Sequence, residues 1–206
     1  MSKYGYVGKE SDIPQQAFKS NAGVLSVNDH LGLSQENKLT QYGQLELIET
    51  QTASAATAID FTTIKENEYD THFMTIALTD ISASAFMGVR FFEEGVIETA
   101  SVYDDVAMTN NSEVKSTSRD RIIISQSNYI NTAMGINVYF FNLRNNSRYS
   151  FVAFNGVGQK FPSADINYYN GAGTMHQTSI VDGIRLLPQS GNFTGDISLY
   201  GIREYR

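Results

Sequence analysis

The chain has 206 residues, with 15 basic and 22 acidic side chains, a formal net charge of −7 at pH 7 and no cysteine. This length suits one β domain with a sizeable core and is too short for a multidomain enzyme. The negative charge argues against nucleic acid or an anionic membrane as a partner, and the lack of cysteine excludes disulfides, a thiolate nucleophile and cysteine-based metal sites.

The N-terminal segment, residues 1–42, differs from the rest of the chain. Its apolar residues are sparse and follow no period of 2 or 3.6, so the segment cannot bury a face of its own. We expect an extended arm that becomes ordered on another surface, such as a neighbouring subunit; the alternative is an irregular edge of the main domain. The sequence shows neither an export signal nor an apolar run long enough to span a membrane.

From residue 43 to residue 206, short runs rich in Val, Ile, Thr, Tyr and Phe alternate with Gly, Asn, Asp and Ser clusters, a pattern typical of an all-β sandwich. In the last run, Ile197 and Leu199 are expected to share a buried face. Gly95 is expected to supply a positive φ in a hairpin. The expected strands are Gln44–Thr50, Ala56–Phe61, Thr71–Thr79, Phe86–Phe92, Val96–Tyr103, Arg121–Gln126, Ile136–Asn142, Tyr149–Asn155, Ser179–Leu187 and Gly195–Gly201. The predicted fold is an antiparallel, jelly-roll-like β-sandwich preceded by an extended N-terminal arm.

Two polar or glycine-rich stretches, Tyr103–Asp120 and Gly156–Gln177, are expected to be long loops, where binding surfaces usually lie. Tyrosine rings in such loops can stack on the apolar face of a sugar, although packing in a core or interface is an open alternative. The glycines at 156, 158, 171 and 173 are interpreted as turn formers. The candidate surface-loop binding residues are Asp104, Asp105, Asn110, Asn111, Tyr168 and Tyr169.

Patterns that would carry catalysis or bind a metal are weak. His30, His72 and His176 are scattered, and no G-x-S-x-G nucleophile motif occurs. Adjacent carboxylates such as Glu93 and Glu94 lie where solvated turns are expected, which argues against a glycosidase pair. We therefore expect no catalytic residues, no metal and no cofactor.

Several segments make the sandwich resemble a family of structural proteins from tailed bacteriophages, especially those of marine bacteria and cyanobacteria. The firmest is the C-terminal stretch Ser190–Ile202, which is similar to the final strand of phage structural and tail-fibre proteins. The other segments that carry the resemblance are Gly43–Thr52, Ala58–Phe61, Val89–Ala100, Val138–Leu143 and Ile184–Leu186.

The resemblance implies a non-enzymatic virion protein, assembled in the host cytoplasm, that is displayed on the particle as an oligomer. Head decoration and tail-fibre attachment are both found in this family. Because no internal repeat or heptad pattern indicates a fibre stalk, we favour a capsid decoration (cement) protein whose arm binds major capsid protein. A trimer would fit local threefold sites. The arm residues expected to contact the capsid or another subunit are Tyr4, Tyr6, Ile13, Phe18, Val24 and Leu25.

Two other functions remain open at this stage. One is a tail or tail-fibre adaptor that binds a host receptor or surface glycan through the two predicted loops. The other is a carbohydrate-binding or sugar-cleaving domain, because β-sandwiches host such sites. A test of glycan binding, with or without release of sugar fragments, distinguishes a carbohydrate-binding or sugar-cleaving domain from a purely structural protein.

Overall fold

The computed structural model describes residues 45–110, 112–125, 133–159 and 166–202. Within these ranges every element of regular secondary structure is a β-strand, so the predicted all-β fold is confirmed. The expected arm, residues 1–42, lies outside the described residues together with its named apolar residues, and so does Asn111. The strands are β1 (Leu45–Ala56), β2 (Ile59–Phe61), β3 (Thr71–Ile81), β4 (Met87–Glu93), β5 (Val96–Ile97), β6 (Tyr103–Thr109), β7 (Glu113–Arg119), β8 (Ile122–Ile123), β9 (Met134–Phe141), β10 (Ser150–Gln159), β11 (Ile166–Met175), β12 (Gly183–Pro188) and β13 (Phe193–Ile202).

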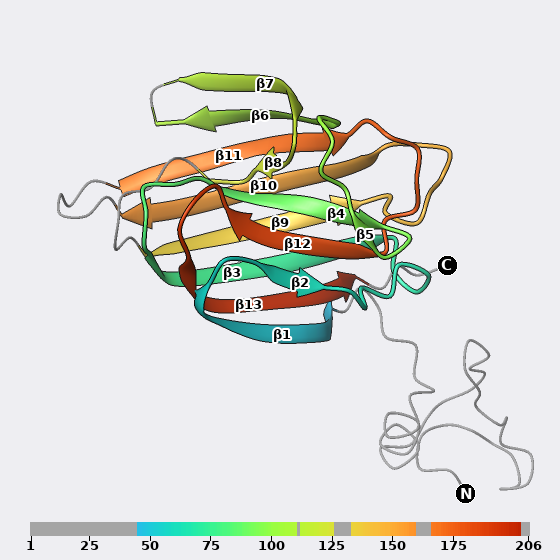
Figure 1. Ribbon diagram of the computed structural model, residues 1–206, viewed down its shortest axis with the longest axis horizontal. Coiled ribbons are helices and arrows are strands. Elements are labelled where there is room, and N and C mark those ends of the chain that lie inside the picture. Colours follow the sequence, from blue (N-terminus) through green and yellow to red (C-terminus); the bar gives the residue numbers. More distant parts are fainter. Residues whose placement is uncertain (1–44, 111, 126–132, 160–165, 203–206) are drawn as a thin grey trace, which may run out of the picture. The chain divides into compact units, whose positions relative to one another are not determined.

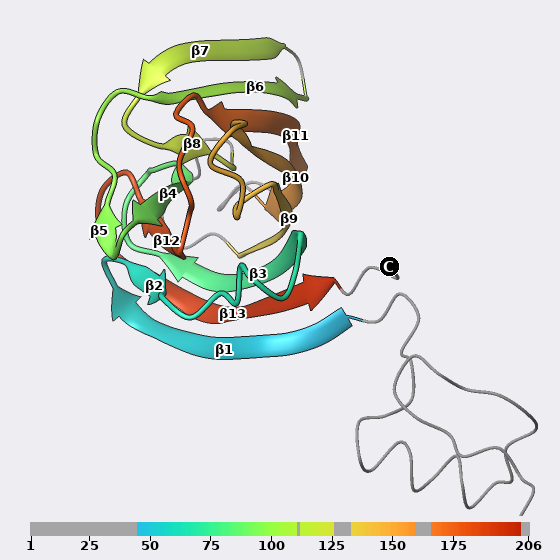
Figure 2. The same cartoon turned by 90° about the vertical axis from the view of Figure 1, so that its right-hand side faces the viewer.

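The strands form two antiparallel sheets of unequal size (Figure 1). The larger sheet has eight strands in the order β1-β13-β3-β9-β10-β11-β6-β7. The smaller sheet has five, with β2-β12-β4-β5 in order and β8 also paired to β4. Figure 2 shows the larger sheet curving round the side on which β4 and β12 lie. The antiparallel sandwich expected from the sequence is therefore confirmed.

The order of strands within the two sheets is that of a jelly roll with an extension. The chain alternates between the sheets from β1 to β4, so β1-β13-β3-β9 in the larger sheet is matched by β2-β12-β4-β8 in the smaller one. The remaining strands β10, β11, β6 and β7 lengthen the larger sheet beyond β9. This extension gives the larger sheet a broad outer face.

Alternate residues of the strands fill the core between the sheets. Ile197 and Leu199 of β13 are fully buried, as the alternating pattern predicted. Phe91 of β4 meets Phe140 of β9 edge to face, with ring centroids 6.1 Å apart. The buried Tyr103 hydroxyl accepts a hydrogen bond from the Phe91 N–H at 3.1 Å, which compensates for its loss of water. The intervening residues of the large sheet point outward.

The β4–β5 hairpin was predicted correctly. Glu94 and Gly95 both have positive φ, 51° and 75°, as a tight hairpin turn requires. The strand predicted at Val96–Tyr103 was too long, because β5 ends at Ile97 and a new strand begins at Tyr103. The strand predicted at Ser179–Leu187 likewise starts only at Gly183.

The two predicted long loops were wrong. The stretch Tyr103–Asp120 forms the hairpin of β6 and β7, and most of the described part of Gly156–Gln177 belongs to β10 and β11. The glycines of β11 are needed in the strand because atoms of neighbouring strands lie too close to leave room for a Cβ atom. A Cβ on Gly171 would lie 2.3 Å from the Val106 carbonyl oxygen, and one on Gly173 would lie 2.6 Å from Ile122 Cγ2. These glycines permit close packing rather than turns.

This packing predicts a large difference between two Gly→Ala substitutions. Gly171→Ala is expected to lower the free energy of unfolding by about 1–3 kcal/mol, because backbone atoms of Val106 and Ala107 block the new methyl group. Gly135→Ala has nothing within 4 Å of the added Cβ and is expected to be neutral or to stabilise by about 0.5 kcal/mol. Urea denaturation of both variants measures the difference, and equal midpoints would contradict the close approach of β11 to β6.

Candidate functional site

The acidic pair predicted as a surface-loop site is divided between the two faces of β6. Asp104 accepts a hydrogen bond from the Ser118 N–H at 2.8 Å and lies 3.2 Å from His176 Nδ1. Asp105 points inward, where its carboxylate lies 3.5 Å from Arg119 Nε with its side chain only 1% exposed. Adjacent residues of a strand face opposite sides, so these two carboxylates do not converge on one ligand.

The predicted tyrosine pair is divided in the same way. Tyr169 is buried and stacks on Phe154, with ring centroids 5.5 Å apart. Tyr168 is 46% exposed on the outer face. Asn110 lies beside Tyr168, since its Oδ1 accepts the Tyr168 N–H at 2.8 Å while its Nδ2 donates to the Ile166 carbonyl at 2.8 Å. Of the two tyrosines, only Tyr168 is available to an external ligand.

His72 and Glu93, which were considered for metal binding or catalysis, interact with different partners. His72 is buried with Nε2 2.7 Å from the Ile64 carbonyl oxygen, and burial lowers its pKa. The Ser179 hydroxyl donates a hydrogen bond to Glu93. Across the described ranges, no group of three or more His, Asp or Glu side chains could hold a metal ion. A search of the same ranges finds no helix able to cross a membrane.

The burial of Asp105 predicts a pH dependence of stability. Burial raises the pKa of this carboxyl above its ordinary value, and the positive charge of the nearby Arg119 opposes this rise without cancelling it. The folded state therefore holds the proton more tightly than the unfolded state, and this contribution to stability falls as the pH rises through the folded-state pKa. Asp105→Asn is expected to increase the free energy of unfolding at pH 7 by about 1 kcal/mol, since it removes a buried charge.

Urea denaturation of Asp105→Asn and of the unmodified protein at about pH 4 and pH 7 measures this effect. The gain in stability is expected to be larger at the higher pH. A gain of equal size at both pH values would contradict a raised pKa at Asp105.

The outer face of the larger sheet carries apolar side chains at one end. Tyr200 of β13, Phe73 of β3 and Tyr139 of β9 are in register on adjacent strands. The Phe73 ring lies 4.7 Å from the Tyr139 ring and 6.1 Å from the Tyr200 ring, measured between centroids. We call this surface the aromatic face; it consists of Leu45, Leu47, Phe73, Tyr139, Phe141, Phe151, Tyr200 and Ile202.

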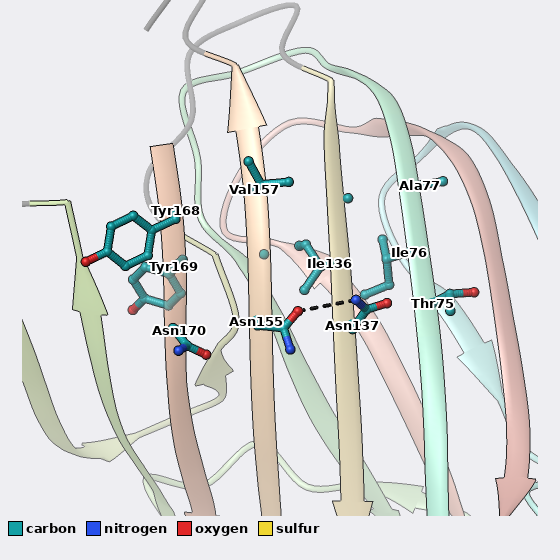
Figure 3. A pocket seen from close by; sticks show the side chains of 12 residues that line it. Thr75, Ile76, Ala77, Ile136, Asn137, Asn155, Val157, Tyr168, Tyr169 and Asn170 are labelled. Carbon is teal, nitrogen blue, oxygen red and sulfur yellow. Dashed lines mark hydrogen bonds between the residues drawn. The ribbon is translucent and has the colours of Figure 1, made fainter. Parts of the chain in front are cut away.

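A row of asparagines follows the aromatic face along the strands. Asn137 of β9, Asn155 of β10 and Asn170 of β11 are in register on three adjacent strands. Asn137 Nδ2 donates a hydrogen bond to Asn155 Oδ1 at 3.2 Å (Figure 3). On β9, Tyr139 and Asn137 are successive outward-facing residues, so the outer face changes from apolar to amide side chains over two residues of the strand.

An open hollow of about 510 Å³ lies along this row. We call it the amide hollow. Its lining contains no Asp, Glu, Lys, Arg or His. Figure 3 shows Tyr168 at one side and Thr75 at the other, with the asparagines between them. The residues that line it are Thr75, Ile76, Ala77, Gly135, Ile136, Asn137, Asn155, Gly156, Val157, Tyr168, Tyr169 and Asn170.

Reasoning from the sequence identified Tyr168 but missed the asparagine row. Asn137 and Asn155 stand in runs that were correctly predicted to be strands, where asparagine is depleted. That rarity was the available signal. Asn170 was hidden because its strand had been predicted as a loop.

Comparison with known proteins adds little. No family model and no curated protein matches the chain. Among solved structures, the chain is similar to the "Protein of Unknown Function SO2946 from Shewanella oneidensis MR-1", at 10% identity, with 91% of this chain and 99% of that chain covered and a TM-score of 0.24. A likeness at this level carries no argument about function.

Proposed function

We propose that this chain is a non-enzymatic structural protein of a tailed-phage virion, and specifically a capsid decoration protein. Residues 1–42 clamp neighbouring capsid subunits, and the sandwich, residues 43–206, is displayed on the outside of the particle. The sequence resemblance supports the virion setting. In the fold, the firmest part of that resemblance supplies β13, which pairs with both β1 and β3.

The observation that carries the assembly role is the aromatic face. Leu47 is 59% exposed and Phe151 is 48% exposed, although both are large and apolar. Contiguous exposed apolar surface of this kind marks protein–protein contacts, and aromatic residues are enriched in the cores of such contacts.

We infer that a second copy of this chain covers the aromatic face. Each copy carries a net charge of −7, so copies repel one another over most of their surface. The residues of the aromatic face include no charged side chain, so contact there brings no like charges together and buries no unpaired charge. This contact predicts a homo-oligomer, and we favour a trimer because it would fit local threefold sites on a capsid.

The copy number per virion tests the proposed function. Purified particles are analysed by quantitative mass spectrometry against the major capsid protein. Hundreds of copies are expected for a decoration protein, because many weak ties together resist internal pressure. A few copies per particle would contradict decoration and indicate a tail protein, and absence from particles would contradict a virion role.

A tail or tail-fibre adaptor is the second candidate function. The amide hollow favours it, because an open site on a sheet that combines amide groups with apolar side chains suits recognition of a host surface molecule. The two candidates use different parts of the outer face, so variants of one part test them separately.

A further inference from the structure

We propose that the amide hollow binds an uncharged saccharide chain. The inference rests on the second candidate function and names the chemical class of its receptor. The binding itself requires only the described sheet and can be measured without a virion. It rests on four features: the hydrogen-bonding capacity of the asparagine row, the exposed ring beside it, the absence of charge and the open space above Gly135.

The asparagine row offers both donors and acceptors. Each side-chain amide has two N–H donors and one carbonyl acceptor, and sugar hydroxyls both donate and accept. The bond from Asn137 to Asn155 uses one N–H of the first amide and part of the acceptor capacity of the second, which leaves groups free for a ligand. Adjacent strands are about 4.8 Å apart, so the amides repeat at roughly the length of one sugar ring.

An apolar platform lies beside these amides. Tyr168 is 46% exposed and Val157 is 53% exposed. The Tyr168 N–H donates a 2.8 Å hydrogen bond to Asn110 Oδ1, which holds the backbone that carries this ring. An aromatic ring that combines an apolar body with a polar tip suits the mixed surface of a sugar.

The charge of the site restricts the ligand. The lining contains no acidic or basic side chain, and the whole chain has a net charge of −7. An acidic polysaccharide would lose its hydration without gaining a cation and would be repelled at long range. An uncharged glycan pays neither cost.

The hollow is already formed in the free protein. Its floor spans the neighbouring strands β3, β9, β10 and β11, and the side chains of Ile76 and Ile136 are buried beneath it. Gly135 belongs to the outward-facing positions of β9, and a Cβ placed on it would meet nothing within 4 Å. The missing side chain therefore leaves open space in the lining, and a larger residue can occupy that space without disturbing the fold.

The test is a titration of the ¹⁵N-labelled full-length chain with neutral hexasaccharides: cellohexaose, maltohexaose, mannohexaose and N-acetylated chitohexaose. Binding of at least one is expected to shift the side-chain amide signals of Asn137, Asn155 and Asn170. Asn155→Ala is expected to weaken binding roughly three- to tenfold, the value of one hydrogen bond. Tyr168→Ala is expected to weaken it about fivefold through the loss of ring contact.

Gly135→Leu is the decisive variant, because it fills the hollow and is expected to weaken binding more than tenfold. Ala172→Leu is the matched control, since it adds the same side chain to an exposed position of β11 outside the hollow. Thermal melting confirms that both variants fold. If Gly135→Leu does not fold, Asn155→Ala and Tyr168→Ala decide the question.

Absence of binding to every hexasaccharide would overturn the inference, as would binding that survives Gly135→Leu. Preferential binding of an oligouronate over the neutral sugars would also overturn it. These results are distinguishable from failure of the proposed virion role, which is measured by copy number in particles and does not depend on sugar.

Discussion

A chain that lacks residues 1–33 is expected to fold but to lose its binding to capsids completely. All strands of the described sandwich lie between Leu45 and Ile202, so the deletion removes none of these strands. In our proposal the deleted segment supplies most of the tie to the capsid, through apolar burial and strand addition. Co-sedimentation with undecorated particles measures binding, and thermal melting measures folding.

Replacement of Tyr4, Tyr6, Ile13, Phe18, Val24 and Leu25 by serine is the matching test, because it keeps the length of the arm and removes its apolar groups. This variant is also expected to lose capsid binding. A truncated chain that still decorates particles would rule out the clamp and move the capsid contact to the sandwich.

The double substitution Phe141→Ser with Phe151→Ser is expected to weaken self-association by more than tenfold. The two residues are partners on β9 and β10 and are 38% and 48% exposed, so their removal takes apolar area from the proposed contact without opening the core. A buried aromatic anchor at an interface typically contributes about 2 kcal/mol or more. Sedimentation equilibrium over a range of protein concentrations measures the change.

The control for this variant is Val96→Ser with Ile180→Ser. These apolar residues are also exposed, at 68% and 44%, but neither belongs to the larger sheet. They are expected to leave the association constant unchanged. Equal weakening by both double variants would show that the aromatic face has no special part in assembly, and a monomeric unmodified chain would exclude the homo-oligomer.

The sequence was a good guide where strands carry large alternating side chains. Ile197 and Leu199 of β13 show period-2 alternation, and both the strand and its buried face were predicted correctly. Prediction failed for β11, where Gly171 and Gly173 look like turn residues. They are required by the close approach of Val106 and Ile122, which are distant in the sequence. Such a contact leaves no local signal.

The candidate site was harder to predict than the fold. The asparagine row exists only because β9, β10 and β11 bring Asn137, Asn155 and Asn170 into register. Their positions in the sequence give no common spacing. Asp105 illustrates the opposite case. It follows Asp104 in the sequence and was predicted to share a surface site with it, but strand geometry turns its side chain inward, where it is buried.

The pairing of β1 with β13 has a consequence for synthesis of the protein. Thr52 and Asp196, which are hydrogen-bonded across these strands, are 144 positions apart. A nascent chain therefore holds β1 without its partner until nearly the whole sandwich has been translated, and such non-local pairing slows folding. Its exposed apolar edge is open to aggregation during that interval. Chaperones that bind extended apolar segments are expected to engage the chain at this stage, and co-expression of such chaperones is expected to raise the soluble yield in recombinant expression.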